Sequence, residues 1–281
     1  MLLSETAESF EAAGFTLRGM LHRAATNSAS WGLVICPPFG EERKSAARVM
    51  TLAARALGRE GFHVLRFDYR GTGESDGEMA DAGPRQWAED IRGACRHLAV
   101  RTGADQIGLL GIRFGAALAA MASRESAPSP FLAAWAPLWS GRSCLEEIRR
   151  HLAATRLVVD GPRGEPMSRC AACNKTLDIG GFSMSPGDCE RFESAAVFEE
   201  DKVDVVIALH LSGRAATAEE NRSMCRRLTS RDGAWRAVAV AGRPFWVTAS
   251  RYDPQPLVDS TVRALKECGV SAQSYSDDRG P

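Results

Sequence analysis

The sequence lacks an excess of charge of either sign. Its 281 residues carry 35 Lys plus Arg against 35 Asp plus Glu, so the formal net charge is zero. Nucleic-acid-binding proteins usually show a strong basic excess, so the balance excludes that class of partner. Lysine is scarce, with 4 lysines against 31 arginines. Most cations are therefore permanently charged planar groups that suit carboxylates and phosphates.

The sequence has no long apolar run, and we expect neither a membrane-spanning segment nor a secretory signal. The charge-free stretch 126–141 contains three prolines, whereas a spanning helix needs about 20 consecutive apolar residues. The N-terminus carries Glu5, Glu8 and Glu11 and no basic residue before Arg18, unlike a secretory signal. We therefore expect a cytoplasmic protein in which the eight cysteines are reduced thiols.

A metal-binding pattern is incomplete. Cys170 and Cys173 form a C-x-x-C pair and Cys189 follows, but there is no histidine nearby. A structural zinc site needs four ligands, and a redox C-x-x-C normally opens a helix after a strand. We therefore expect neither a metal nor a cofactor.

Short apolar runs alternate with helical patterns along most of the chain. This alternation predicts right-handed strand–helix–strand units and an α/β fold with a mostly parallel, doubly wound sheet. The nearly continuous apolar runs are typical of strands buried on both faces. The predicted strands are 31–36, 63–68, 107–111, 131–138, 203–211 and 235–240, and the predicted helices are 42–59, 87–98, 114–123, 218–228 and 257–268.

The alternation breaks in one internal stretch. Between 141 and 200 the sequence is rich in glycine and proline, and regular patterning resumes only at about 203. We interpret 141–200 as a lid or cap inserted into a single domain that spans 1–281. Residues 271–281 are predicted to be a polar tail.

A glycine-flanked turn is the most informative motif. Residues 111–116 read GIRFGA, after a predicted strand and at the start of a predicted helix. This is the context of the nucleophile elbow, whose motif is G-x-S-x-G. The nucleophile position holds Arg113. Because the central residue of an elbow is strained, we predict a positive φ for Arg113.

Two further motifs accompany the elbow. Residues 38–45 read PFGEERKS and residues 65–75 read LRFDYRGTGES. Together the three motifs resemble the α/β-hydrolase superfamily, and most closely its second type of exosortase A system-associated hydrolase and serine-aminopeptidase-like relatives. The resemblance covers roughly 15–270 and is strongest over 31–125.

The resemblance implies an α/β-hydrolase fold and a hydrolase acting on a small ester, thioester or amide. It also implies that the loop after the first buried strand supplies a backbone N–H to an oxyanion hole. The candidate oxyanion or ligand-binding residues are Phe39, Gly40 and Phe114.

The acid of a Ser–His–Asp triad is missing from its expected place. Family order would put it near 212–216, where there is no aspartate, and Glu219 and Glu220 come slightly late. In an alternative register, 245–249 is the acid-bearing strand and Asp253 is the acid.

The histidine is missing as well. It would lie within 241–246, but no histidine follows His210, which is the best remaining candidate for a base. A structural role for His210 is the competing interpretation. The other possible nucleophiles fit structural roles better, Cys36 as a core residue and Ser45, Ser75 and Ser140 as caps or turn residues.

Arg113 has two compatible roles. It could bind an anionic ligand bidentately, or it could pair internally with Glu41 or Glu42. Some acidic partner is required, because an unpaired buried arginine is costly.

Two function hypotheses follow. The first is an exosortase-associated type of hydrolase with non-standard or lost activity on a small-molecule substrate. The second is a catalytically silent pseudoenzyme that binds an anionic ligand or a partner through Arg113.

Overall fold

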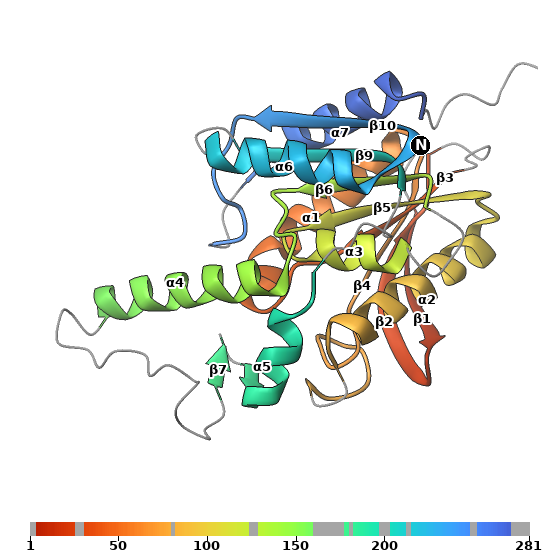
Figure 1. The fold of residues 1–281 in the computed structure, drawn as a ribbon. Helices are drawn as coiled ribbons and strands as arrows, with labels where there is room; N and C mark the ends of the chain where they lie inside the picture. Colours follow the sequence, from red (N-terminus) through yellow and green to blue (C-terminus); the bar gives the residue numbers. More distant parts are fainter. Residues whose placement is uncertain are drawn as a thin grey trace, which may run out of the picture.

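A computed structural model describes most of the chain (Figure 1). The described residues are 4–25, 31–79, 82–123, 129–159, 177–179, 182–196, 203–211, 215–247 and 252–270. They form an eight-stranded sheet in the order β1-β2-β4-β3-β5-β6-β9-β10, with helices on both faces.

The strands of this sheet are parallel from β4 to β10, and β1 and β2 run antiparallel at one edge. This confirms the mostly parallel, doubly wound sheet. The strands are β1 Glu5–Ala12, β2 Phe15–His22, β3 Trp31–Cys36, β4 His63–Phe67, β5 Gln106–Ile112, β6 Phe131–Trp135, β9 Val203–Leu211 and β10 Thr229–Val240.

The helices cover the two faces in separate groups. Helices α1 and α7 pack on one face, and α2, α3 and α6 pack on the other (Figure 1). The helices are α1 Glu41–Arg59, α2 Pro84–Thr102, α3 Gly115–Ser123, α4 Gly141–Val159, α5 Pro186–Glu193, α6 Ala215–Leu228 and α7 Gln255–Glu267.

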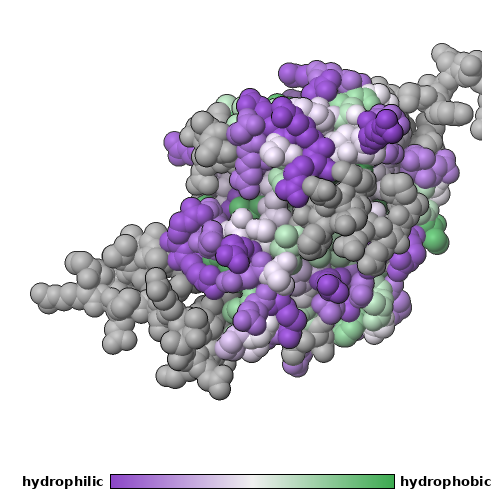
Figure 2. Space-filling model, viewed as in Figure 1, coloured by the Kyte–Doolittle hydropathy of each residue, from purple (hydrophilic) through white to green (hydrophobic). Residues whose placement is uncertain are grey.

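Successive residues of the central strands enter the two cores alternately. In β3, Val34 and Cys36 join the core under α2 and α3, whereas Leu33 and Ile35 join the core under α1 and α7. All four are buried, because a central parallel strand has helices on both sides. Among the coloured residues of the face drawn in Figure 2, hydrophilic ones predominate and hydrophobic colour is confined to small areas.

Two predicted strand boundaries are wrong and one hairpin was not predicted. The predicted strand 235–240 begins earlier, at Thr229. The predicted strand 131–138 ends at Trp135, because Ala136 has a φ of 46° and Pro137 has no N–H to donate. The hairpin β1–β2 was not predicted. Its turn is made by Ala13 and Gly14, both with positive φ.

The segment 141–200 contains α4, α5 and a small hairpin of β7 Leu177–Ile179 and β8 Phe182–Met184. In Figure 1 these elements gather at the lower left, beyond the end of the main sheet.

The three cysteines of the incomplete metal-binding pattern are placed differently. Cys170 and Cys173 lie outside the described residues, as does the tail 271–281, and Cys189 is buried on α5. The described part of the chain contains no cluster of metal-ligating side chains and no helix long and apolar enough to cross a membrane.

Candidate functional site

The turn between β5 and α3 has the geometry of an elbow. Arg113 has a φ of 55°, which confirms the predicted positive φ. A Cβ at Gly111 would lie 2.3 Å from the Ala116 Cα, and a Cβ at Gly115 would lie 2.2 Å from the Cys36 carbonyl oxygen. Glycine is therefore required on both sides of Arg113 because the backbone of the turn packs against itself and against β3.

The Arg113 guanidinium is paired with Glu42, as the sequence predicted for one of the two glutamates. Its Nε–H donates to the Glu42 Oε1 at 3.1 Å, and Nη2 donates to the same oxygen at 3.1 Å. The Arg113 side chain is 3% exposed and the Glu42 side chain 13%. Glu41 lies elsewhere, with its exposed carboxylate 2.6 Å from the Lys44 Nζ.

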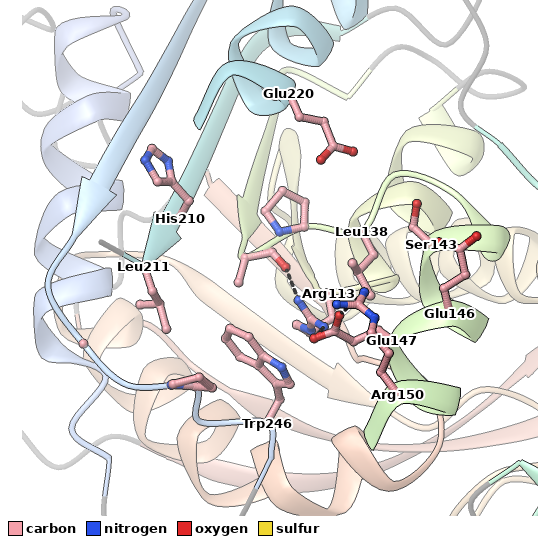
Figure 3. Close-up of a pocket in the computed structure, with 14 residues that line it drawn as sticks. Arg113, Leu138, Ser143, Glu146, Glu147, Arg150, His210, Leu211, Glu220 and Trp246 are labelled. Carbon is pink, nitrogen blue, oxygen red and sulfur yellow. Dashed lines mark hydrogen bonds and ion pairs between the residues drawn. The ribbon is translucent and has the colours of Figure 1, made fainter. Parts of the chain in front are cut away.

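Three further contacts enclose the guanidinium (Figure 3). Nη1 donates to the Ala136 carbonyl oxygen at 3.1 Å, and Nη2 lies 3.5 Å from an oxygen of Glu147 on α4. The Arg113 Cζ lies 4.2 Å from the ring centroid of Trp246. Glu147 and Trp246 were not predicted. Trp246 lies in the segment after β10 where a hydrolase would carry its histidine.

Burial opposes the ionisation of Glu42. It raises the pKa of the Glu42 carboxyl, although the nearby Arg113 guanidinium acts in the opposite direction. Glu147, which raises this pKa further, has a second partner, because an Arg150 nitrogen lies 2.7 Å from its other oxygen. The two carboxylates and two guanidinium groups thus form one connected network at the elbow.

A cavity of about 420 Å³ lies beside Arg113. Its walls come from the elbow, the loop after β6, α4, the end of β9, α6 and the loop after β10. Figure 3 shows Glu220 reaching toward the cavity from α6, opposite Trp246. The polar lining residues are Arg113, Ser143, Glu146, Glu147, Arg150, His210 and Glu220.

His210, the candidate base predicted from the sequence, lies at this cavity on β9. Its side chain is 8% exposed, and its buried Nδ1 has no hydrogen-bond partner among the described residues. Burial lowers the pKa of His210, and Arg222 lowers it further. The ring is therefore neutral at pH 7, and no described carboxylate orients it.

The candidate oxyanion residues lie next to the elbow. Phe39 and Gly40 belong to the loop between β3 and α1, and Phe114 follows Arg113. Both phenyl rings are buried against Phe192 of α5, at centroid distances of 5.0 and 4.8 Å. The resemblance correctly implied that this loop lies next to the elbow. The contact with Phe192 was not predicted. The role of their N–H groups in an oxyanion hole stays a prediction.

The alternative acids are placed as follows. Residues 212–214 lie outside the described part of the chain, and Glu219 and Glu220 are exposed on α6. Asp253 accepts a hydrogen bond from the Gln255 N–H at 3.0 Å, next to the start of α7. The Asp253 carboxylate therefore stabilises the turn before α7, and it is not a partner of His210.

Three of the alternative nucleophiles have structural roles. The Ser75 hydroxyl donates to the Asp68 carbonyl oxygen at 2.6 Å. Ser140 accepts a hydrogen bond from the Ser143 N–H at 3.1 Å, at the start of α4. The Cys36 thiol is fully buried, and burial raises its pKa well above the usual value. Ser45 lies half-buried within α1.

A family model described as serine aminopeptidase, S33, matches residues 32–224, which is more than half of the chain. The chain belongs to the serine aminopeptidase S33 family. No curated protein sequence matches it. Within this S33 chain, the elbow and the PFGEERKS loop both fall inside the matched region.

Solved structures show the same α/β-hydrolase fold. Est1E from Butyrivibrio proteoclasticus with ferulic acid bound has a TM-score of 0.66 and 15% identity, covering 93% of this chain and 99% of that one. The α/β hydrolase GrgF from Penicillium sp. sh18 has a TM-score of 0.65 and 21% identity, covering 95% and 99%. The esterase PF2001 from Pyrococcus furiosus has a TM-score of 0.63 and 13% identity, covering 95% and 92%.

Proposed function

We propose that this S33 family protein has lost serine-hydrolase chemistry at its elbow and binds a small molecule in the cavity beside Arg113. The observation that carries the proposal is the internal pairing of Arg113 with Glu42 at the nucleophile position. A guanidinium stays protonated at physiological pH. It therefore cannot attack a carbonyl carbon or accept a proton from water.

The surroundings of Arg113 support the same conclusion. Trp246 packs on the guanidinium from the segment expected to supply the histidine, and an indole has no basic nitrogen. The elbow backbone and the adjoining cavity are nevertheless retained. Retention of the cavity together with loss of the nucleophile favours binding over catalysis.

An anionic ligand would have to compete with Glu42. Nε, Nη1 and Nη2 of Arg113 all have acceptors inside the protein. An incoming carboxylate or phosphate therefore gains a bidentate contact only when the Glu42 carboxylate moves away or is protonated. The raised pKa of Glu42 favours its protonation on acidification, so anion binding at this site is expected to strengthen at low pH.

We also propose that 141–200 acts as a lid. It supplies Glu147 to the Arg113 network and Phe192 to the Phe39–Phe114 cluster, so it covers the elbow from two sides. The three motifs further support the exosortase-associated branch. Neighbouring genes for exopolysaccharide synthesis and export would support that assignment, and their absence would count against it.

The second candidate is an Arg113-dependent hydrolysis of a small ester, thioester or amide. It is favoured by one observation, the neutral His210 at the same cavity with an unpartnered Nδ1. In that case His210 would have to activate water, and Arg113 would stabilise the developing negative charge.

A substrate panel distinguishes the candidates. The wild type, Arg113→Ala and the exposed-site control Arg59→Ala are assayed with p-nitrophenyl esters and acyl thioesters. We expect no turnover above background in any of them. Turnover by the wild type and by Arg59→Ala that disappears in folded Arg113→Ala would overturn the binding proposal in favour of the second candidate.

A further inference from the structure

A second cavity, lined in part by α5, does not have Arg113 among its lining residues. Its volume is about 590 Å³, and none of its lining residues lines the cavity at the elbow. Its apolar walls come from the loop before α2, from α2, from α3 and from the β8–α5 segment. They include Met79, Trp87, Met121, Met184 and Phe192.

The walls of this cavity suit an apolar molecule of variable shape. Trp87 and Phe192 are each 1% exposed and Met184 is 4% exposed, so these side chains are held within the fold. Methionine side chains are flexible and polarisable, and they adapt to irregular apolar shapes. The volume falls within the range of small-molecule sites, which are mostly apolar with a few polar groups.

The polar groups of this cavity lie at its rim. Arg85 of α2 and Arg191 of α5 are exposed there, and Asp188 is the one acid among the described lining residues. Asp188 is an ion-pair partner of Arg191. Among the described lining residues the charges therefore sum to one positive charge, with Arg85 in excess.

We propose that this cavity binds an amphipathic small acid. Its hydrocarbon part lies against the methionine and aromatic side chains, and its carboxylate lies at the rim near Arg85. The site is separate from the proposed elbow site, because the two cavities share no lining residue. Phe192, which lines this cavity, packs against Phe39 and Phe114 beside the elbow.

The test is a calorimetric titration of the full chain with straight-chain carboxylates from hexanoate to dodecanoate, below their micelle-forming concentrations. Each buried methylene should raise the affinity about fourfold until the cavity is full. Decanol and decylamine are the charge controls, and both should bind more weakly than decanoate. Equal binding of the acid and the amine would contradict the carboxylate position.

Variants locate the binding. Ala82→Leu narrows the cavity and should shift the preferred acid to a shorter chain. Arg85→Gln should weaken decanoate binding about two- to fivefold, the effect of a partly solvated charge. The matched control Arg96→Gln, exposed elsewhere on α2, should leave it unchanged.

Two results would overturn the proposal. One is the absence of saturable binding by every acid, and the other is binding that Ala82→Leu leaves unchanged. Neither result bears on the proposed function, because the elbow cavity shares no lining residue with this one.

Discussion

We expect the ion pair of Arg113 with Glu42 to contribute strongly to the stability of the fold. The Arg113 side chain is 3% exposed, and it donates to Glu42 from two nitrogens. Arg113→Met keeps the apolar stem but leaves the Glu42 carboxylate without its main partner. Loss of one member of a buried ion pair costs about 3–5 kcal/mol of unfolding free energy, and we expect a loss in that range.

The double variant should be more stable than the added effects of the two single variants on the unfolding free energy predict. Glu42→Gln alone removes charge-assisted hydrogen bonds and should cost about 1.5–3 kcal/mol. Combining it with Arg113→Met removes both charges, and residues in direct contact show coupling energies of about 0.5–3 kcal/mol. The double variant should therefore recover about 2 kcal/mol relative to additivity.

Urea unfolding at pH 7, followed by tryptophan fluorescence and circular dichroism, measures the three free energies. The exposed pair of Arg55 with Glu5 is the control, and Arg55→Met should cost less than about 1 kcal/mol. Additive effects of the two elbow variants, or a cost of Arg113→Met no larger than that of Arg55→Met, would refute the buried pairing.

Three other predictions concern the scaffold. Burial lowers the pKa of His22 from 6.5 to about 4. The unfolded chain therefore takes up a proton at His22 before the folded protein does, and the unfolding free energy should fall as the pH falls from about 6.5 to about 4. The loss should reach about 3 kcal/mol in pH-dependent urea unfolding and shrink in His22→Gln. Gly115→Ala drives a Cβ into a backbone carbonyl of β3 and should lower the unfolding free energy by about 1–3 kcal/mol. Gly187→Ala should not, because the added Cβ would lie 3.9 Å from an Arg191 nitrogen, an ordinary contact. Asp90→Ala removes the fully buried partner of Arg70 and should lower the unfolding free energy by about 3–5 kcal/mol; a change below 1 kcal/mol would contradict a buried pair.

The parallel part of the sheet could be predicted because its signals are local. Apolar runs such as 31–36 and 107–111 are buried on both faces, and glycine or proline marks where they end. The hairpin β1–β2 was missed because its alternating pattern includes a buried Glu8, which reads as an exposed position. Glu8 is tolerated there because Arg101 of α2 donates to both of its oxygens, at 2.9 and 3.0 Å, and this contact is not visible in the sequence.

The same distinction applies to the candidate site. The pairing of Arg113 with Glu42 could be predicted because the elbow and the first turn of α1 follow adjacent parallel strands, β5 and β3, whose ends meet at one edge. Glu147, Trp246 and Phe192 come from segments whose positions depend on tertiary packing. One signal was available in the sequence, a tryptophan at 246 in the segment where a serine hydrolase carries its histidine.

The most direct test of the account asks whether the chain has an activated serine. The full-length protein is incubated with a fluorophosphonate, which reacts covalently with the nucleophile of serine hydrolases, and its intact mass is then measured. We predict an unmodified mass, because Arg113 occupies the elbow and is paired with Glu42. A stoichiometric adduct that maps to a serine would contradict the account.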